Sequence, residues 1–439
     1  SLSDEVGTQL FSNHKVVGIV AGLMAIFALI PGLPTLPFLI ISGVAGFIAF
    51  KKKKALDLDL KMAEEAATVE TNLNAKKQPL KKGPENVMDF LNIEAMELEI
   101  GYRLVALLDT DKGGDLLERI TQIRRQTAME LGIILPSIRV RDNLQLGPTE
   151  YQVKLKGLPI ESGEVIPGKL LAMDAGTVME PSPIKGIKTV EPAFGLPALW
   201  IDEEIKEQAE ATGYTVVTPS AVAATHLTEI IKKHAHEILT RADVLALLDN
   251  LKAKSESLVE DILSDNLTEA EIQIVLQNLL KEKVTIRDLA SILECLSVHC
   301  RISKNPDYLT EQVRIALARS ICKQNLTPEN ELVVITVAPE IEQSIMEGMS
   351  PDGQSLNIDP MLMQGIIESL NREVETALNN HGLQPVILCS GPVRLPFRRL
   401  IERTLPQLTV MSYNEVTPST NARSIGIISI NPTAQIGYQ

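Results

Sequence analysis

The chain has 439 residues, which is too long for one typical hydrophobic core and predicts two to four globular units. Its 56 acidic residues outnumber its 42 basic residues, for a formal net charge of −14. This balance argues against nucleic acid as a main partner, because phosphate binding requires a basic surface. Four cysteines in such a length do not make a disulfide framework, which is typical of a reducing compartment.

Residues 16–50 form an apolar tract with no ionisable side chain in 35 residues. A straight membrane helix needs roughly 20 apolar residues, so the tract is too long for one span and slightly short for two. Pro31 and Pro34, on either side of Gly32, would break a helix near its middle. The pattern therefore favours a transmembrane hairpin of two short helices over residues 14–50, rather than one long kinked helix or a buried pair of soluble helices.

The segments flanking this hairpin indicate its orientation. Four lysines at 51–54 follow the tract directly, and lysines beside a span favour the cytoplasmic side. Residues 1–13 then also form a cytoplasmic segment, and their polar character predicts that the chain is the later part of a longer protein. Residues 51–84 read as a flexible linker of net charge +4, which fits attraction to anionic membrane lipid, while residues 85–439 carry −17.

Beyond the linker the pattern is that of a multidomain α/β protein. Alternating apolar residues at 96–100 predict a half-buried strand, and helical spacing over 113–132 predicts a helix that stops at Gly132. Two further strands follow, over "IRVRDNL" and "TEYQVKLKGL". We expect a first cytosolic α/β subdomain formed by 85–158 plus 219–238.

Three more units and a tail complete the predicted organisation. The Gly- and Pro-rich stretch 159–218 predicts a small inserted subdomain with short strands and one helix. Residues 239–325 have a nearly continuous helical pattern with repeated capping residues, which indicates a helical subdomain. Strand and helix patterns alternate again over 326–431, a C-terminal α/β subdomain, and 432–439 form a tail.

The sequence contains no convincing catalytic or cofactor-binding motif. The stretch "LLDTDKGGD" lacks the glutamate that closes a calcium loop, and two histidines at 234 and 236 point to opposite sides of a helix. Ser390 in "LCSGP" lies between a predicted strand and helix but lacks the frame of a nucleophile elbow. No P-loop or dinucleotide fingerprint occurs, so we expect no catalytic residue, metal or cofactor, and no enzyme activity.

One short segment, "EPAFGLPALWI" at 191–201, concentrates aromatic residues in a chain that is only 3% aromatic. Two prolines stiffen it and lower the entropy lost on docking, and Phe194 offers a large apolar area at low rotamer cost. Two interpretations are open for Phe194, a core position or a docking anchor. Trp200, which is followed by Ile201, is predicted to lie in the core.

Several stretches together resemble the export-gate family of type III secretion, in its flagellar branch. They are "FALIPGLPTLPF", "LDLDLKMAEEAA", "IRVRDNL", "EPAFGLPALWI", "GYTVVTPSAVAATHLTEI", "QPVILCSG" and "GPVRLPFRRLIERTLPQLTVMSYNEV". The resemblance implies an inner-membrane, multi-pass protein of which this chain holds the last two spans and a large cytoplasmic domain. It further implies assembly as a homo-oligomeric ring of nine, beside other membrane export-gate proteins.

The resemblance also implies a function and a docking site. In this family the cytosolic ring receives flagellar export chaperone–substrate complexes, helped by a cytosolic ATPase complex and its stalk, and export is driven by the proton motive force. The family motif Asp-Pro-Ala-Phe-Gly-Leu aligns with residues 191–196 here, with Glu191 in place of the aspartate, so Phe194 falls on the key aromatic residue. The resemblance therefore implies partner binding at Glu191, Phe194, Leu196, Val217, Val222 and Thr225.

Two alternatives remain at this point. The homologous export gate of a virulence-type injectisome shares the architecture, although the linker and docking motifs favour the flagellar branch. A membrane-anchored enzyme or channel would instead place titratable groups in a cleft. The membrane tract has no ionisable residue that could form a proton pathway.

Overall fold

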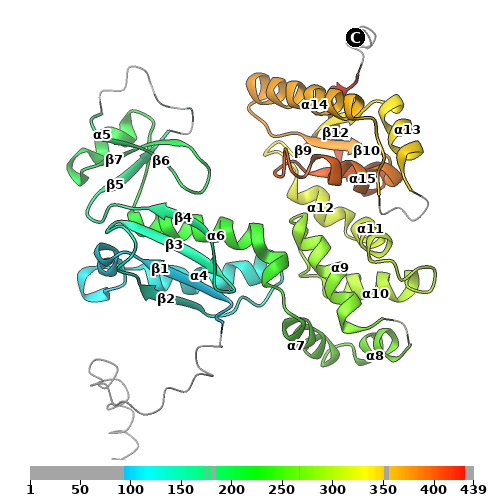
Figure 1. The fold of residues 1–439 in the computed structure, drawn as a ribbon, viewed down its shortest axis with the longest axis horizontal. Helices are drawn as coiled ribbons and strands as arrows, with labels where there is room; N and C mark the ends of the chain where they lie inside the picture. Colours follow the sequence, from blue (N-terminus) through cyan, green and yellow to red (C-terminus); the bar gives the residue numbers. More distant parts are fainter. Residues whose placement is uncertain are drawn as a thin grey trace, which may run out of the picture. The chain divides into compact units, whose positions relative to one another are not determined.

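The computed structural model describes residues 93–430, except 175, 177, 179–183, 266 and 351–354. The predicted membrane hairpin, the linker and the tail lie outside these residues. None of the helices in the described part is both long and apolar enough to cross a membrane. The described residues belong to one compact unit and contain three four-stranded sheets and a set of helices (Figure 1).

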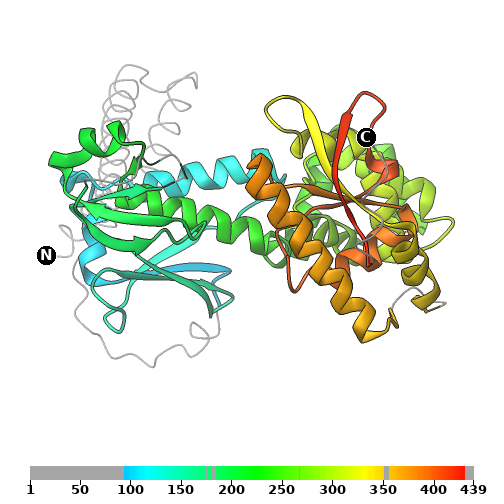
Figure 2. The same ribbon diagram turned by 90° about the horizontal axis from the view of Figure 1, so that it is seen from above.

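The first subdomain is a mixed sheet with strand order β2-β1-β3-β4, covered by two helices. Its strands and helices are β1 (Met96–Ile100), α4 (Leu116–Glu130), β2 (Ile138–Asp142), β3 (Glu150–Leu155), β4 (Leu158–Glu164) and α6 (Pro219–Ile238), with short 3-10 helices at Tyr102–Leu107 and Thr110–Lys112. The predicted strand–helix–strand unit is confirmed, since β1 and β2 pair in parallel across α4. The helix α4 runs beside α6 (Figure 2).

The boundary of the inserted subdomain differs from the prediction. We expected it to begin at residue 159, but β4 pairs antiparallel with β3 as far as Glu164. The reason is that these residues form a hairpin through the turn at Lys156 and Gly157, both of which have positive φ. The first sheet therefore extends past the predicted boundary.

The inserted subdomain is a small antiparallel sheet with strand order β6-β7-β5-β8. It comprises β5 (Leu170–Met173), β6 (Ile187–Val190), β7 (Pro197–Ile201), a 3-10 turn at Glu203–Ile205, α5 (Lys206–Ala211) and β8 (Thr215–Val217). The core of this subdomain is small and centres on Ala172, Ile201 and Ala209. Trp200 is 3% exposed and packs into the core of the first subdomain, so the prediction that it is a core residue is confirmed.

The helical subdomain directly follows α6, and two of its helices begin with capping boxes. Thr240 and Thr268 each accept a backbone N–H of the first turn, while Asp243 and Glu271 reach back. The helices are α7 (Arg241–Lys252), α8 (Glu256–Asp265), α9 (Glu269–Lys281), α10 (Leu289–His299), α11 (Pro306–Ala316) and α12 (Ala318–Gln324).

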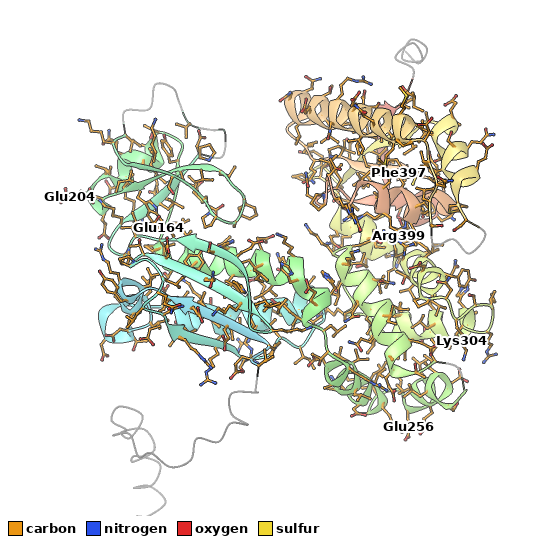
Figure 3. All side chains as sticks on the ribbon, in the orientation of Figure 1. Glu164, Glu204, Glu256, Lys304, Phe397 and Arg399 are labelled. Carbon is orange, nitrogen blue, oxygen red and sulfur yellow. The ribbon has the colours of Figure 1, made fainter. Side chains whose placement is uncertain are left out.

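The C-terminal subdomain contains a fully parallel sheet with strand order β11-β10-β9-β12. Its elements are β9 (Glu331–Val337), α13 (Pro339–Gly348), α14 (Pro360–His381), β10 (Val386–Cys389), α15 (Gly391–Ile401), β11 (Val410–Ser412), a 3-10 turn at Tyr413–Glu415 and β12 (Asn421–Ile428). One face of the sheet shares a core with the helical subdomain, and the other is covered by α13, α14 and α15. Phe397 of α15 lies inside the core between the sheet and these three helices, whereas Arg399 of the same helix reaches the surface (Figure 3).

Candidate functional site

The turn between β6 and β7 is held from inside by the side chain of Glu191. One carboxylate oxygen of Glu191 accepts the backbone N–H of Ala193 at 2.9 Å, and the other accepts that of Phe194 at 2.7 Å. Gly195 closes the turn with φ +71°, a left-handed conformation that favours glycine, and its N–H donates to the Glu191 carbonyl oxygen at 3.0 Å. The backbone of the turn is therefore fixed before any partner arrives.

The fixed turn presents Phe194 to solvent. The side chain of Phe194 is 60% exposed, while Trp200, six residues later on β7, is 3% exposed. The alternative that Phe194 is an ordinary core residue does not agree with this exposure. An exposed aromatic ring on a rigid turn has the properties of an interface anchor.

The other predicted contact residues divide into accessible and buried positions. Thr225 on α6 is exposed, and Leu196 and Val217 are half-buried. Glu191 and Val222, in contrast, are each only 2% exposed. The expectation that these two side chains touch a partner is therefore revised: Glu191 satisfies backbone groups of the turn, and Val222 packs in the core beneath α6.

Near the turn lies a polar network that the sequence did not predict, buried at Tyr151 and His226 and exposed at Lys233. The Tyr151 hydroxyl lies 2.8 Å from His226 Nδ1, and His226 Nε2 lies 3.0 Å from a carboxylate oxygen of Glu161. Lys233 donates to the other oxygen of Glu161 at 2.5 Å. A lone histidine next to Thr225 in "AATHL" was the only sequence signal, and its partners come from strands some 65 and 75 positions away.

The surroundings of the network shift the pKa values of Tyr151 and Glu161. Burial, assisted by the charges of Glu191 and Glu161, raises the pKa of Tyr151, so its hydroxyl stays protonated and forms a hydrogen bond with His226 Nδ1. Burial alone would raise the pKa of Glu161, but Lys233 and His226 outweigh it and lower that pKa. His226 then donates through Nε2 to the Glu161 carboxylate, which places a fixed hydrogen-bonded chain between the first sheet and α6.

A groove of about 490 Å³ begins at this turn. It is lined by Ala193 of the turn and by His226 and Glu229 of α6, and it continues to residues that follow α9 and α15. Ala193 and α6 thus share one surface depression, so the turn and the helix carrying Thr225 belong to the same region.

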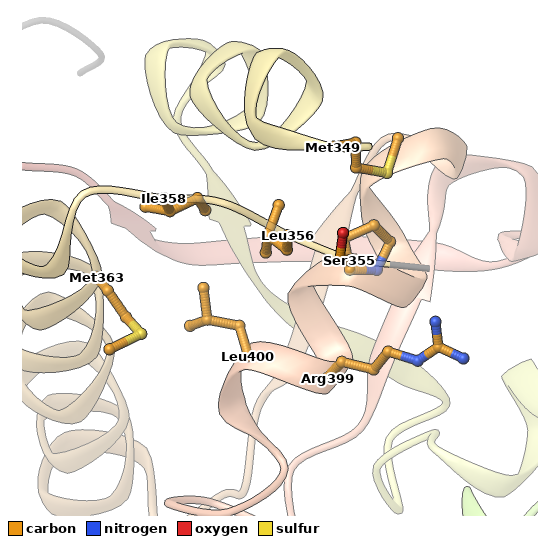
Figure 4. Close-up of a pocket in the computed structure, with 8 residues that line it drawn as sticks. Met349, Ser355, Leu356, Ile358, Met363, Arg399 and Leu400 are labelled. Carbon is orange, nitrogen blue, oxygen red and sulfur yellow. The ribbon is translucent and has the colours of Figure 1, made fainter. Parts of the chain in front are cut away.

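A separate apolar pocket of about 250 Å³ lies within the C-terminal subdomain. Met363 of α14 and Leu400 of α15 face it from two sides, and Met349 and Leu356 close it from the loop after α13 (Figure 4). Its lining is largely apolar, with Arg399 at the edge.

The potential nucleophiles of the described part are poorly placed for chemistry. Burial raises the pKa of Cys295 to about 11 and raises that of Cys389 further, so both thiols stay protonated near neutral pH. The backbone N–H of Ser390 donates to Glu342 at 2.8 Å, and the Ser390 hydroxyl has no hydrogen-bond partner within the described residues. No group of three or more His, Cys, Asp or Glu in the described ranges could hold a metal ion.

Comparison with known proteins identifies the family. The model of the FHIPEP family matches residues 1–421. The chain belongs to the FHIPEP family. It is 39% identical to the flagellar biosynthesis protein FlhA of Bacillus subtilis over 98% of this chain and 62% of that protein. It is 35% identical to the protein of the same name from Escherichia coli over 97% of this chain and 60% of that protein.

These matches confirm the resemblance to the flagellar branch that the motifs suggested. The chain spans about three fifths of the length of these curated relatives. Among solved structures it is similar to the Chlamydia pneumoniae CdsV protein, with a TM-score of 0.69 and 25% identity over 77% of this chain and 98% of that one. Nonameric SctV-C from EPEC has the same fold, with a TM-score of 0.63 and 23% identity over 80% of this chain and 100% of that one.

Proposed function

We propose that the chain is part of the export gate of a flagellar type III protein secretion apparatus in the bacterial inner membrane. Its described part docks complexes of export chaperones with their cargo, and the proton motive force drives export. The family and the flagellar relatives support the first statement. The second is supported chiefly by one observation, the 60% exposure of Phe194 on a turn that Glu191 holds rigid.

The division between accessible and buried residues gives this docking site a definite form. Phe194 acts as the anchor, and Thr225, Leu196 and Val217 supply the accessible surroundings. Glu191 and Val222 act beneath the surface. A preformed turn reduces the ordering that binding would otherwise require, so more of the contact energy appears as affinity.

We further propose that the cytosolic parts assemble as a ring of nine. The matched structures of SctV-C and of the EscV cytosolic domain are both described as nonameric. Another matched structure is a complex of the CdsV and CdsO proteins. It supports the proposal that the ring also contacts a second cytosolic component, the stalk of the export ATPase complex.

The export gate of a virulence-type injectisome is the second candidate. The likeness to the EscV cytosolic domain from a type III secretion system favours it at the level of the fold. The greater identity to flagellar relatives, together with the Phe194 motif, favours the flagellar function.

The docking proposal is tested by the binding of a purified flagellar chaperone–cargo complex to the whole chain and to Phe194→Ala. Truncation of an anchor should weaken binding by about 2 kcal/mol or more, roughly 30-fold in affinity. Ile187→Ala is the matched control, since Ile187 is a large apolar residue of the same hairpin and is 52% exposed. Equal affinities for the two variants, with the fold intact by circular dichroism, would contradict docking at Phe194.

A further inference from the structure

The groove that begins at Ala193 carries a positive charge in a strongly acidic molecule. Its lining contains six basic side chains, from the second half of α6 and from the residues at and after the ends of α9 and α15. They are Lys232, Lys233, Lys281, Lys283, Arg398 and Arg403. Only three acidic residues, Glu161, Glu229 and Glu402, line the same groove, which leaves an excess of three positive charges.

The walls of the groove are fixed to one another by specific contacts. Gln273 and Gln277 of α9 each donate to the carbonyl oxygen of Leu239, directly after α6, at 3.1 Å. Lys281 of α9 forms an ion pair of 3.1 Å with Glu402, directly after α15. The segments around α6, α9 and α15 that form the walls of the groove are therefore held together by direct contacts.

The basic groups differ in how far they are already neutralised. Lys233 pairs with Glu161 at 2.5 Å, and Lys232 pairs with Glu130 at 3.2 Å. Arg398 is 8% exposed and donates to two backbone carbonyl oxygens. Lys283 and Arg403 are both exposed, and within the described residues neither forms an ion pair. These two cations are available to an incoming anion.

We propose that this groove binds an acidic peptide segment of the partner that Phe194 anchors, an inference that rests on the proposed docking function. The position of Ala193 makes the groove continuous with the exposed turn, so one partner can contact both. A volume of about 490 Å³ accommodates several side chains. The three glutamates in the lining disfavour the dense charge of a nucleic acid and suit a peptide of intermittent carboxylates.

The groove would then act mainly on the rate and selectivity of docking. Exposed charges at the edge of an interface steer encounter and exclude partners of the wrong sign, while a buried aromatic anchor determines how long the complex lasts. Steering by charge weakens as salt is added, whereas the contribution of Phe194 does not.

A direct test measures the binding of fluorescein-labelled octaglutamate to the whole chain by anisotropy, with octaglutamine as the uncharged control. We expect octaglutamate to bind at low salt and octaglutamine not to bind. Lys283→Glu combined with Arg403→Glu should weaken octaglutamate binding at least tenfold. The neutral pair Lys283→Gln with Arg403→Gln should give an intermediate loss, and Arg125→Glu, an exposed position on α4 outside the groove, should give none.

The outcomes separate this inference from the docking proposal. Phe194→Ala should leave octaglutamate binding unchanged but weaken the chaperone–cargo complex at both low and high salt. The charge-reversed pair should weaken that complex at low salt only. Unaltered octaglutamate binding in the charge-reversed pair, equal binding of octaglutamine, or tighter binding of an eight-residue oligothymidylate would each overturn the acidic-peptide assignment. Failure at Phe194 would appear separately, as unchanged binding of the complex.

Discussion

The turn at Phe194 and the junction between the helical and C-terminal subdomains both depend on buried carboxylates, with opposite results. At the turn, Glu191 accepts hydrogen bonds from two backbone N–H groups and so holds the turn in the conformation that exposes Phe194 to solvent. At the junction, Arg394 donates to Glu282 at 2.6 Å and also binds Glu311, and it is 0% exposed. Glutamate thus fixes the conformation of an exposed turn in one region and joins two subdomains by ion pairs in the other.

The junction is extensive as well as buried. Arg314, which is 1% exposed, pairs with Glu415 at 2.5 Å and with Glu282 at 3.2 Å. These residues come from α11, from the end of α9 and from the turn after β11. A network that joins distant segments at a shared core favours a rigid junction. The comparison therefore predicts that mutations in the junction affect stability, and mutations at the turn affect binding.

The largest expected effect follows from Arg394→Met. The substitution removes the partner of Glu311 and leaves Glu282 with Arg314 alone in a largely buried site, which should destabilise the protein by about 3–5 kcal/mol. Urea unfolding measures this loss. Arg399→Met is the matched control, because Arg399 of the same helix pairs with Asp307 at 2.8 Å in a half-exposed site. Exposed pairs contribute about 0–1 kcal/mol, and a comparable loss in both variants would contradict the contrast.

The junction should also respond to acid. Burial alone would raise the pKa of Glu282, but Arg314 and Arg394 outweigh it and lower that pKa from 4.5 to about 2. A depressed pKa in the folded state contributes stability that is complete above 4.5 and is lost as pH falls toward 2. Burial raises the pKa of Glu311 above 4.5, so this group adds stability as pH falls toward 4.5, above the range in which Glu282 loses it.

The expected result is a free energy of unfolding that falls between pH 4.5 and pH 2 and has a shallower slope in Glu282→Gln, which lacks the titrating group. Urea titrations at intervals across that range measure the slope. Parallel profiles for the two proteins would show that Glu282 does not govern the acid response.

A smaller effect is expected from Tyr151→Phe. This substitution removes the hydroxyl that is hydrogen-bonded to His226 Nδ1 and leaves that buried ring nitrogen without its partner, at a cost of about 1–3 kcal/mol. Tyr308→Phe provides the comparison, because the Tyr308 hydroxyl lies 3.3 Å from His299 Nδ1 in a half-buried site, against 2.8 Å for Tyr151 and His226. Thermal unfolding distinguishes the two. A larger loss for Tyr308→Phe would contradict the importance assigned to the buried network.

The sequence predicted individual helices and strands better than it predicted which polar side chains are buried. Alternation at β1, helical spacing in α4 and the capping residue of α9 depend on neighbours within a few residues, and each was confirmed. The burial of Glu191 could not be predicted in this way. A carboxylate in a turn with proline and glycine is typical of a surface, and its burial depends on tertiary packing.

The junction and the groove likewise depend on contacts between segments that are far apart in the sequence. Arg314 and Glu415 lie 101 positions apart, and Arg394 and Glu282 lie 112 positions apart. In the sequence these arginines resemble ordinary helix-surface charges. Only the shared core of the helical subdomain and the C-terminal sheet makes them internal. Long-range ion pairs of this kind have no local pattern from which they could be predicted.

A double-mutant cycle between Glu191 and Phe194 tests the central claim most directly. The binding of a chaperone–cargo complex is measured for the unaltered chain, Glu191→Ala, Phe194→Ala and the double variant, with the fold of each verified by circular dichroism. If Glu191 acts by presenting Phe194, Glu191→Ala weakens binding alone but adds little once Phe194 is gone, a coupling of about 0.5–3 kcal/mol. Additive losses, or undiminished binding by Glu191→Ala, would contradict the claim that a buried carboxylate prepares this docking site.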